Sequence, residues 1–174
     1  MGQNKALLVL DTQVNMFDDE FHVYDGDRVL EVIGSLAKKA RSSGSEVIYV
    51  RNNGGSGEPD EPGTPGWEIH SRIRPQEEDV IFDKSSPDAF EGTELQSYLD
   101  TQGVQQLIVV GMQTEMCVAK TCKKAVALGH KVTLVADGHT TFDWEEMTAV
   151  DAITQHNAEL SKLADIKPAT EVEF

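Results

Sequence analysis

The chain has 174 residues, with 15 Lys and Arg against 30 Asp and Glu, which gives a formal net charge of −15. This acidic balance argues against partners such as nucleic acid or an anionic membrane surface, since both need clustered cationic side chains. The composition, 39% hydrophobic and 26% charged, is that of a soluble globular protein. We expect a single domain spanning residues 1–174, located in the cytoplasm, because no secretory signal is visible and two cysteines make no disulfide framework.

Short apolar runs rich in β-branched residues recur along the chain, at residues 6–10, 46–51, 80–82, 107–110 and 131–135. They are continuous rather than alternating, which is typical of strands buried on both faces of a parallel sheet. A weaker sixth strand is expected near residues 160–163. Segments with helical spacing lie between or after these runs, at residues 27–42, 94–102, 114–128 and 143–157. This alternation predicts a three-layer α/β/α, Rossmann-like fold with a mostly parallel six-stranded sheet.

The irregular part of the chain is residues 52–74, which contain Gly-Gly-Ser-Gly and three prolines. A stretch this long without regular structure is usually functional or disordered. Trp67, Ile69 and His70 in its second half favour a loop packed over the domain.

Three chemically reactive residues follow separate predicted strands: Asp11 the first, Lys84 the third and Cys117 the fourth. Ligands of open parallel sheets bind outside the carboxyl ends of the strands. A thiol at the start of a helix also feels the positive end of the helix dipole, which lowers its pKa. Each residue alone has an ordinary structural role, but together they supply a base, a cation and a nucleophile.

The chain resembles the isochorismatase-like cysteine hydrolases over nearly its whole length. The resemblance rests on LLVLDTQVNMF at 7–17, GWEIH at 66–70, Lys84 with AFEGTEL at 89–95, GMQTEMCV at 111–118, AVALG at 125–129 and VAD at 135–137. It implies a catalytic triad of Asp11, Lys84 and Cys117. It also implies a cis peptide at Met112–Gln113, so that the Gln113 and Cys117 N–H groups form an oxyanion hole.

The function that this resemblance implies is hydrolysis of a small amide or carbamoyl C–N bond through a thioester on Cys117. Asp11 would serve as general base and acid, and Lys84 would stabilise the thiolate. Family members that act on isochorismate do not need the thiol, so Cys117 points to the branch that hydrolyses acyl groups. The resemblance further implies a homo-oligomer, either a dimer or a tetramer.

A metal or other cofactor is not expected. Relatives that hydrolyse nicotinamide carry Asp-x-His after the second strand, whereas this chain has Arg51-Asn52-Asn53. His70 alone is poor evidence for a metal site and is expected to pack or to form a hydrogen bond beneath the loop.

The small-molecule substrate is expected to contact Phe17, Trp67 and Phe90, which match positions lining the family's pocket, and His139 on the same rim. Ordinary core packing explains the aromatic residues equally well. Cys122 is interpreted as structural.

Other enzyme classes fit the pattern less well. An aspartyl phosphotransferase needs a second Asp at position 13, which is Gln, and a dinucleotide site needs a glycine-rich turn after the first strand. The main alternative is a non-catalytic scaffold or partner-binding protein with the same fold.

Overall fold

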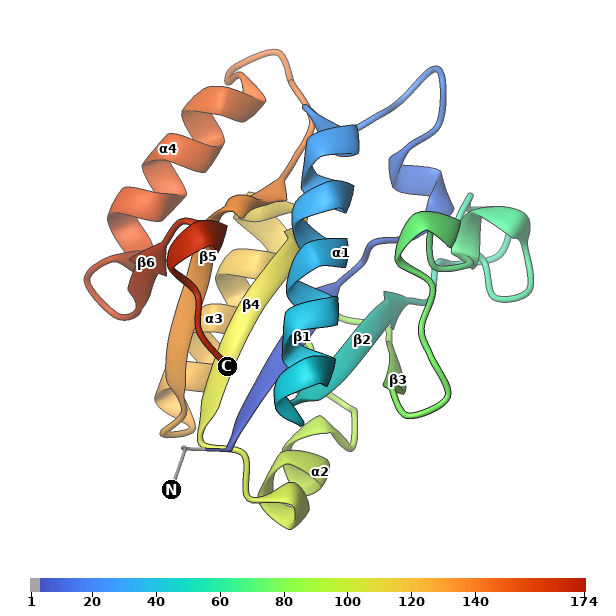
Figure 1. Cartoon of the computed structure of the whole chain (residues 1–174). Coiled ribbons are helices and arrows are strands. Elements are labelled where there is room, and N and C mark those ends of the chain that lie inside the picture. Colours follow the sequence, from blue (N-terminus) through green and yellow to red (C-terminus); the bar gives the residue numbers. More distant parts are fainter. Residues whose placement is uncertain (1–3) are drawn as a thin grey trace.

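A computed structural model describes residues 4–174 and contains one six-stranded sheet in the order β3-β2-β1-β4-β5-β6 (Figure 1). Every strand pairing in this sheet is parallel. The strands are β1 (Lys5–Leu10), β2 (Glu46–Asn52), β3 (Val80–Lys84), β4 (Gln106–Met112), β5 (Lys131–Thr140) and β6 (Asp165–Lys167). The expected α/β fold with a parallel six-stranded sheet is therefore confirmed.

Helices cover both faces of the sheet, as Figure 1 shows. Helix α1 (Gly26–Ser43) packs on one face, and its buried residues join Leu7, Val9 and Ile108 in a single apolar cluster. Helices α2 (Leu95–Gln102), α3 (Ala119–Ala127) and α4 (Ala149–Leu160) contribute to a second cluster on the other face. The four central strands β1, β2, β4 and β5 are buried on both sides over most of their length, which explains their continuous apolar sequences. No helix within residues 4–174 combines the length and apolarity needed to cross a membrane.

Several predicted element bounds are wrong: β5 runs five residues further than expected, α3 begins only at Ala119, and the sixth strand and α4 are also displaced. The sixth strand lies at Asp165–Lys167, whereas residues 160–163 contain the last residue of α4 and the turn after it. Helix α4 begins at Ala149, six residues after the predicted start, because the Thr148 hydroxyl caps it by accepting from the Asp151 N–H. Apolar periodicity does not reveal this cap, which fixes the helix start.

The path of the chain brings the carboxyl ends of the central strands together. From β1 the chain moves outward to β2 and β3, then returns to the other side of β1 to form β4 and β5. This reversal lies between β1 and β4, where open α/β sheets bind ligands. At the carboxyl ends, Leu10 pairs with Val50 on one side and Gly111 on the other, and Asn52 pairs with Lys84.

The segment after β2 packs over this edge of the sheet, as its aromatic residues indicated. It contains two 3-10 turns, η2 (Pro65–Trp67) and η3 (Ser71–Ile73). Backbone hydrogen bonds join it to the segment after β1: the Val14 N–H donates to the Glu68 carbonyl, and the His70 N–H donates to the Thr12 carbonyl, both at 2.9 Å.

Candidate active site

Asp11 is held at the end of β1 by its backbone. Its N–H donates to the Val50 carbonyl at 2.9 Å, and its φ of 50° lies in the left-handed region, which is uncommon for a residue other than glycine. The residue is 1% exposed. One carboxylate oxygen, Oδ2, accepts from Lys84, whereas the buried Oδ1 has no hydrogen-bond partner among residues 4–174.

Lys84 lies at the end of β3, and its ammonium group is buried among three acceptors. Nζ is 3.1 Å from Asp11 Oδ2, 3.3 Å from Cys117 Sγ and 3.3 Å from Asn52 Oδ1. An ammonium has three N–H donors, so these three contacts match its hydrogen-bonding capacity. The contacts place a cation between a carboxylate and a thiol.

Cys117 lies in a wide turn that connects β4 to α3. The turn is π-helical, η4 (Thr114–Val118), and the Val118 N–H donates to the Gln113 carbonyl at 3.1 Å. Such turns occur often at functional sites. The peptide bond between Met112 and Gln113 is cis, at the position that the resemblance implies.

Close packing against β1 explains the glycine that precedes this turn. A Cβ atom on Gly111 would lie 2.1 Å from the Leu10 carbonyl oxygen, and its φ of 122° is one that other residues rarely adopt. Only glycine allows the end of β4 to approach the end of β1 this closely.

The electrostatics of the thiol differ from the sequence-based expectation. Burial and the nearby charge of Asp11 raise the pKa of Cys117 to about 12, and Lys84 only partly offsets them. Burial also raises the pKa of Asp11, again against the opposing effect of Lys84. The expected low thiol pKa is therefore wrong, because desolvation outweighs the favourable charges. A thiolate here forms most easily when the thiol proton moves to Asp11, which leaves the net charge of the site unchanged.

Two of the expected substrate-contacting residues lie in the segments packed together above the sheet. Phe17 meets the ring of His70 edge-on, with ring centroids 4.9 Å apart. The indole N–H of Trp67 donates to Asn53 Oδ1 at 2.9 Å, and the Arg51 guanidinium lies 3.6 Å from the centroid of the Trp67 ring. Both aromatic rings are partly exposed.

The other two expected residues point into the protein. Phe90 is 8% exposed, belongs to the core and stacks on His130. His130 immediately precedes β5, so it lies at the amino ends of the strands, away from Cys117. His139 is 1% exposed, and its ring nitrogens lie 2.8 Å from Thr114 Oγ1 and from Asn157 Oδ1. Neither ring nitrogen of His139 is left for a substrate, because the start of the Cys117 turn and α4 occupy both.

Asn52 and Gln13 are components of the site that sequence reasoning missed. In the sequence, Asn52 stands out only as part of Arg51-Asn52-Asn53, found where nicotinamide-hydrolysing relatives carry Asp-x-His. In the structure it accepts a hydrogen bond from Lys84, and Gln13 holds its backbone. Their position at the ends of β2 and β1 is the one signal that could have identified them.

Within residues 4–174, no three His, Cys, Asp or Glu side chains are grouped so that they could hold a metal ion. His70 instead accepts from the Arg72 N–H through Nδ1 at 3.3 Å, a local hydrogen bond within the loop. Cys122 is fully buried in the core.

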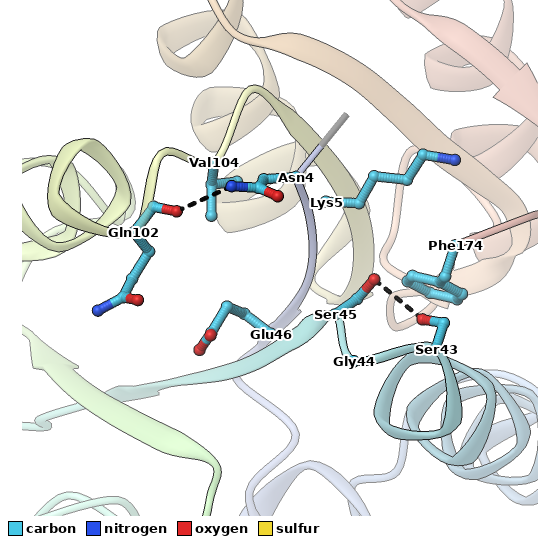
Figure 2. Close-up of a pocket in the computed structure, with 9 residues that line it drawn as sticks. All are labelled: Asn4, Lys5, Ser43, Gly44, Ser45, Glu46, Gln102, Val104 and Phe174. Atoms are coloured by element: carbon cyan, nitrogen blue, oxygen red, sulfur yellow. Dashed lines mark hydrogen bonds between the residues drawn. The ribbon is translucent and has the colours of Figure 1, made fainter. Parts of the chain in front are cut away.

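A separate cavity of about 360 Å³ lies at the amino ends of β1 and β2, shown in Figure 2. Polar side chains such as Asn4, Lys5 and Glu46 line it, together with Phe174 near the end of the chain. The catalytic candidates all lie at the carboxyl ends of the strands, so this cavity is not part of their site.

Comparison with known proteins agrees with the fold. The family model described as "Isochorismatase domain" matches residues 5–165. The chain belongs to the isochorismatase family. It is 26% identical to an isochorismatase of Pseudomonas putida KT2440, whose crystal structure matches with a TM-score of 0.93 over 97% of this chain and 90% of that one.

Two further proteins are similar to this chain in sequence. A streptothricin hydrolase of Streptomyces noursei is 40% identical over 139 residues, which is 80% of this chain and 50% of the relative. The chain thus spans about half the length of that relative. The isochorismatase family protein YrdC of Bacillus subtilis is 28% identical over 170 residues, covering 95% of this chain and 90% of YrdC.

Proposed function

We propose that this isochorismatase-family protein is a cysteine hydrolase that cleaves a small amide or carbamoyl C–N bond. The observation that carries the proposal is the position of Lys84 Nζ, within hydrogen-bonding distance of both Asp11 Oδ2 and Cys117 Sγ. A nucleophile, a base and a cation that stabilises negative charge are the components of covalent acyl transfer.

The first half of the proposed reaction forms a thioester. Asp11 takes the thiol proton of Cys117, and Lys84 stabilises the thiolate that results. The sulfur attacks the substrate carbonyl carbon, and the backbone N–H groups of Gln113 and Cys117 bind the oxyanion that develops. Asp11 then gives its proton to the leaving nitrogen, the C–N bond breaks, and ammonia or an amine departs.

The second half releases the acyl group. Asp11, now ionised again, takes a proton from a water molecule, whose oxygen attacks the thioester carbonyl. The C–S bond breaks, and the proton held on Asp11 passes to the departing sulfur. The products are a carboxylic or carbamic acid and the free thiol, and the enzyme returns to its starting protonation state.

A burial argument supports this function over a non-catalytic scaffold. The side chains of Lys84 and Asp11 are 0% and 2% exposed. Replacing a buried ion pair by apolar residues is often neutral or stabilising, so a scaffold gains little from keeping one beside a thiol. Groups with perturbed pKa values, such as the raised pKa values of Asp11 and Cys117, cluster at functional sites.

The test is a hydrolysis screen with matched cysteine variants. The substrates are small primary amides, carbamoyl compounds and streptothricin, which the similarity to streptothricin hydrolases suggests, and the assays are ammonia or amine release and product mass. We expect Cys117→Ala to lower turnover at least ~1000-fold, because the nucleophile is lost, and Cys122→Ala to keep it. Intact-mass analysis of the stopped reaction should show one acyl group on the unmodified protein and on Cys122→Ala, and none on Cys117→Ala.

Equal activity of the Cys117→Ala variant and the unmodified protein would contradict the thioester mechanism. If no compound is hydrolysed and Cys117 reacts with iodoacetamide no faster than Cys122 at any pH, the proposal of an enzyme is wrong. The protein is then better described as a non-catalytic scaffold with this fold.

A further inference from the structure

Asn52 is the third group that contacts the buried ammonium of Lys84. Its Oδ1 atom lies 3.3 Å from Lys84 Nζ, the same distance as Cys117 Sγ. Of the three acceptors, Asp11 is a carboxylate, Cys117 is the nucleophile, and Asn52 is an amide that carries no charge.

Gln13 fixes the backbone of Asn52. Its side-chain Nε2 donates to the Asn52 carbonyl at 2.9 Å, and its Oε1 accepts from the Asn52 N–H at 2.7 Å. Gln13 is 0% exposed and lies two residues after Asp11. This paired contact joins the end of β1 to the end of β2, so the backbones that carry Asp11 and Asn52 are held together.

Asp60 fixes the orientation of the Asn52 side chain. Asn52 Nδ2 donates to Asp60 Oδ2 at 2.7 Å, which leaves Oδ1 to face Lys84. The Gly54 N–H donates to the Asp60 carbonyl at 2.9 Å, and a Cβ atom on Gly54 would lie 2.0 Å from Asp60 Oδ1. Glycine at position 54 therefore allows Asp60 to reach Asn52.

We propose that Asn52 is a positioning residue that presents an uncharged acceptor to Lys84 and keeps the Asp60 carboxylate one hydrogen bond away from the ammonium. Asp11 is then the one carboxylate in contact with Lys84, and the ammonium can also stabilise a negative charge on the Cys117 sulfur. This inference rests on the proposed function. It also gives the irregular loop after β2 a role, since that loop carries Asp60.

The physical reason is the charge balance of the site. A second carboxylate in contact with Lys84 would compete with the thiolate for the cation and would oppose ionisation of Asp11. The charged or titratable groups that act on Asp11 are Lys84, Cys117 and, through its charge, Asp60, which already raises the Asp11 pKa. The position of the negative charge along the series Lys84, Asn52 and Asp60 is therefore expected to set the pH range in which the reactivity of Cys117 rises. This range is the acid limb of a plot of reaction rate against pH.

The experiment measures the rate of Cys117 alkylation by iodoacetamide against pH, by peptide mass spectrometry, with buried Cys122 as the internal control. It needs no substrate. In Asn52→Asp, which adds a carboxylate beside Lys84, we expect the acid limb to move up by about one pH unit and the neutral-pH rate to fall about tenfold. In Asp60→Asn, which removes a negative charge, we expect the limb to move down by about half a unit.

The swap variant Asn52→Asp/Asp60→Asn separates charge from structure. It keeps the net charge and allows the hydrogen bond between the two side chains to form in the opposite sense. If charge position matters, the swap keeps the upward shift of Asn52→Asp. If Asn52 serves only as a structural hydrogen-bonding residue, the swap returns the profile of the unmodified protein, and the proposal is overturned.

Asn53→Asp is the matched control, because it adds the same charge one residue away, where the side chain accepts from Trp67. We expect the acid limb of Asn53→Asp to shift by less than half as much as that of Asn52→Asp. An equal shift would show that direct contact with Lys84 is not required, and would overturn the proposal. If Asn52→Asp fails to fold in a thermal unfolding check, Asp60→Asn decides, and an unmoved limb there overturns the proposal. If the acid limbs of Cys117 alkylation shift as expected in these variants, but the unmodified protein hydrolyses none of the tested compounds, the results would support this inference and count against the proposed function.

Discussion

Two lysine–carboxylate pairs of this protein have nearly the same length and opposite surroundings. Lys84 and Asp11 are 3.1 Å apart, with side chains 0% and 2% exposed. Lys39 of α1 and Glu173 near the carboxyl terminus are 3.0 Å apart, with side chains 41% and 76% exposed. The first pair lies beside the Cys117 thiol, whereas the second faces solvent.

The comparison teaches that distance alone does not say what an ion pair contributes. In water the attraction is screened and each partner is solvated independently, so an exposed pair adds little. Inside the protein neither charge is tolerated without the other, and the charges control the protonation of a neighbouring thiol. Three predictions test this difference, from the largest expected effect to the smallest.

The largest effect is expected when the buried pair loses its carboxylate. Asp11→Asn keeps the shape of the side chain but leaves the Lys84 ammonium buried without its counter-ion. We expect the free energy of unfolding to fall by about 3–5 kcal/mol, measured by urea unfolding at pH 7.

The double variant Asp11→Asn/Lys84→Met is the control for this loss. It removes both charges, so it should recover most of the stability lost in Asp11→Asn. A loss below ~1 kcal/mol in Asp11→Asn would show that the site is more hydrated than its burial indicates.

A second prediction concerns His139, a buried group without an ionic partner. Burial lowers the pKa of His139 to about 4, from an ordinary value of 6.5. Between these values the unfolded chain binds a proton that the folded protein does not, so stability should fall as pH drops from 6.5 towards 4. The contribution is about 3 kcal/mol over this range.

The measurement is urea unfolding at several pH values for the unmodified protein and His139→Gln. Glutamine keeps a donor and an acceptor but does not titrate. The stability of His139→Gln should therefore depend less steeply on pH than that of the unmodified protein. The other histidines are present in both proteins, so their pKa shifts cancel in the comparison. Parallel curves would refute the assignment to His139.

The smallest effect is expected at the exposed pair. Glu173→Gln makes the same carboxylate-to-amide change as Asp11→Asn, but the Lys39 ammonium that remains is open to water and still donates to the Val172 carbonyl. We expect a change in unfolding free energy of less than ~1 kcal/mol, which disappears in ~0.5 M salt. A loss comparable to that of Asp11→Asn would erase the difference between the two regions.

The sequence by itself determined the succession of strands along the chain and the end of the sheet at which the candidate catalytic residues lie. Continuous apolar runs predict β1 to β5 because a parallel sheet must be buried on both faces. Asp11, Lys84 and Cys117 each follow such a run, and parallel strands bring their carboxyl ends to one edge. Those local signals sufficed to place the three residues at one site.

Only the tertiary structure decided how that site is charged and supported. The high pKa of Cys117 depends on burial from several elements and on the distance to Asp11, which no single segment encodes. The roles of Asn52 and Asp60 depend on contacts between the end of β2, its following loop and β3. Phe90 and His139 look like pocket residues in sequence but point into the protein, because side-chain direction follows from packing across elements that are distant in the chain.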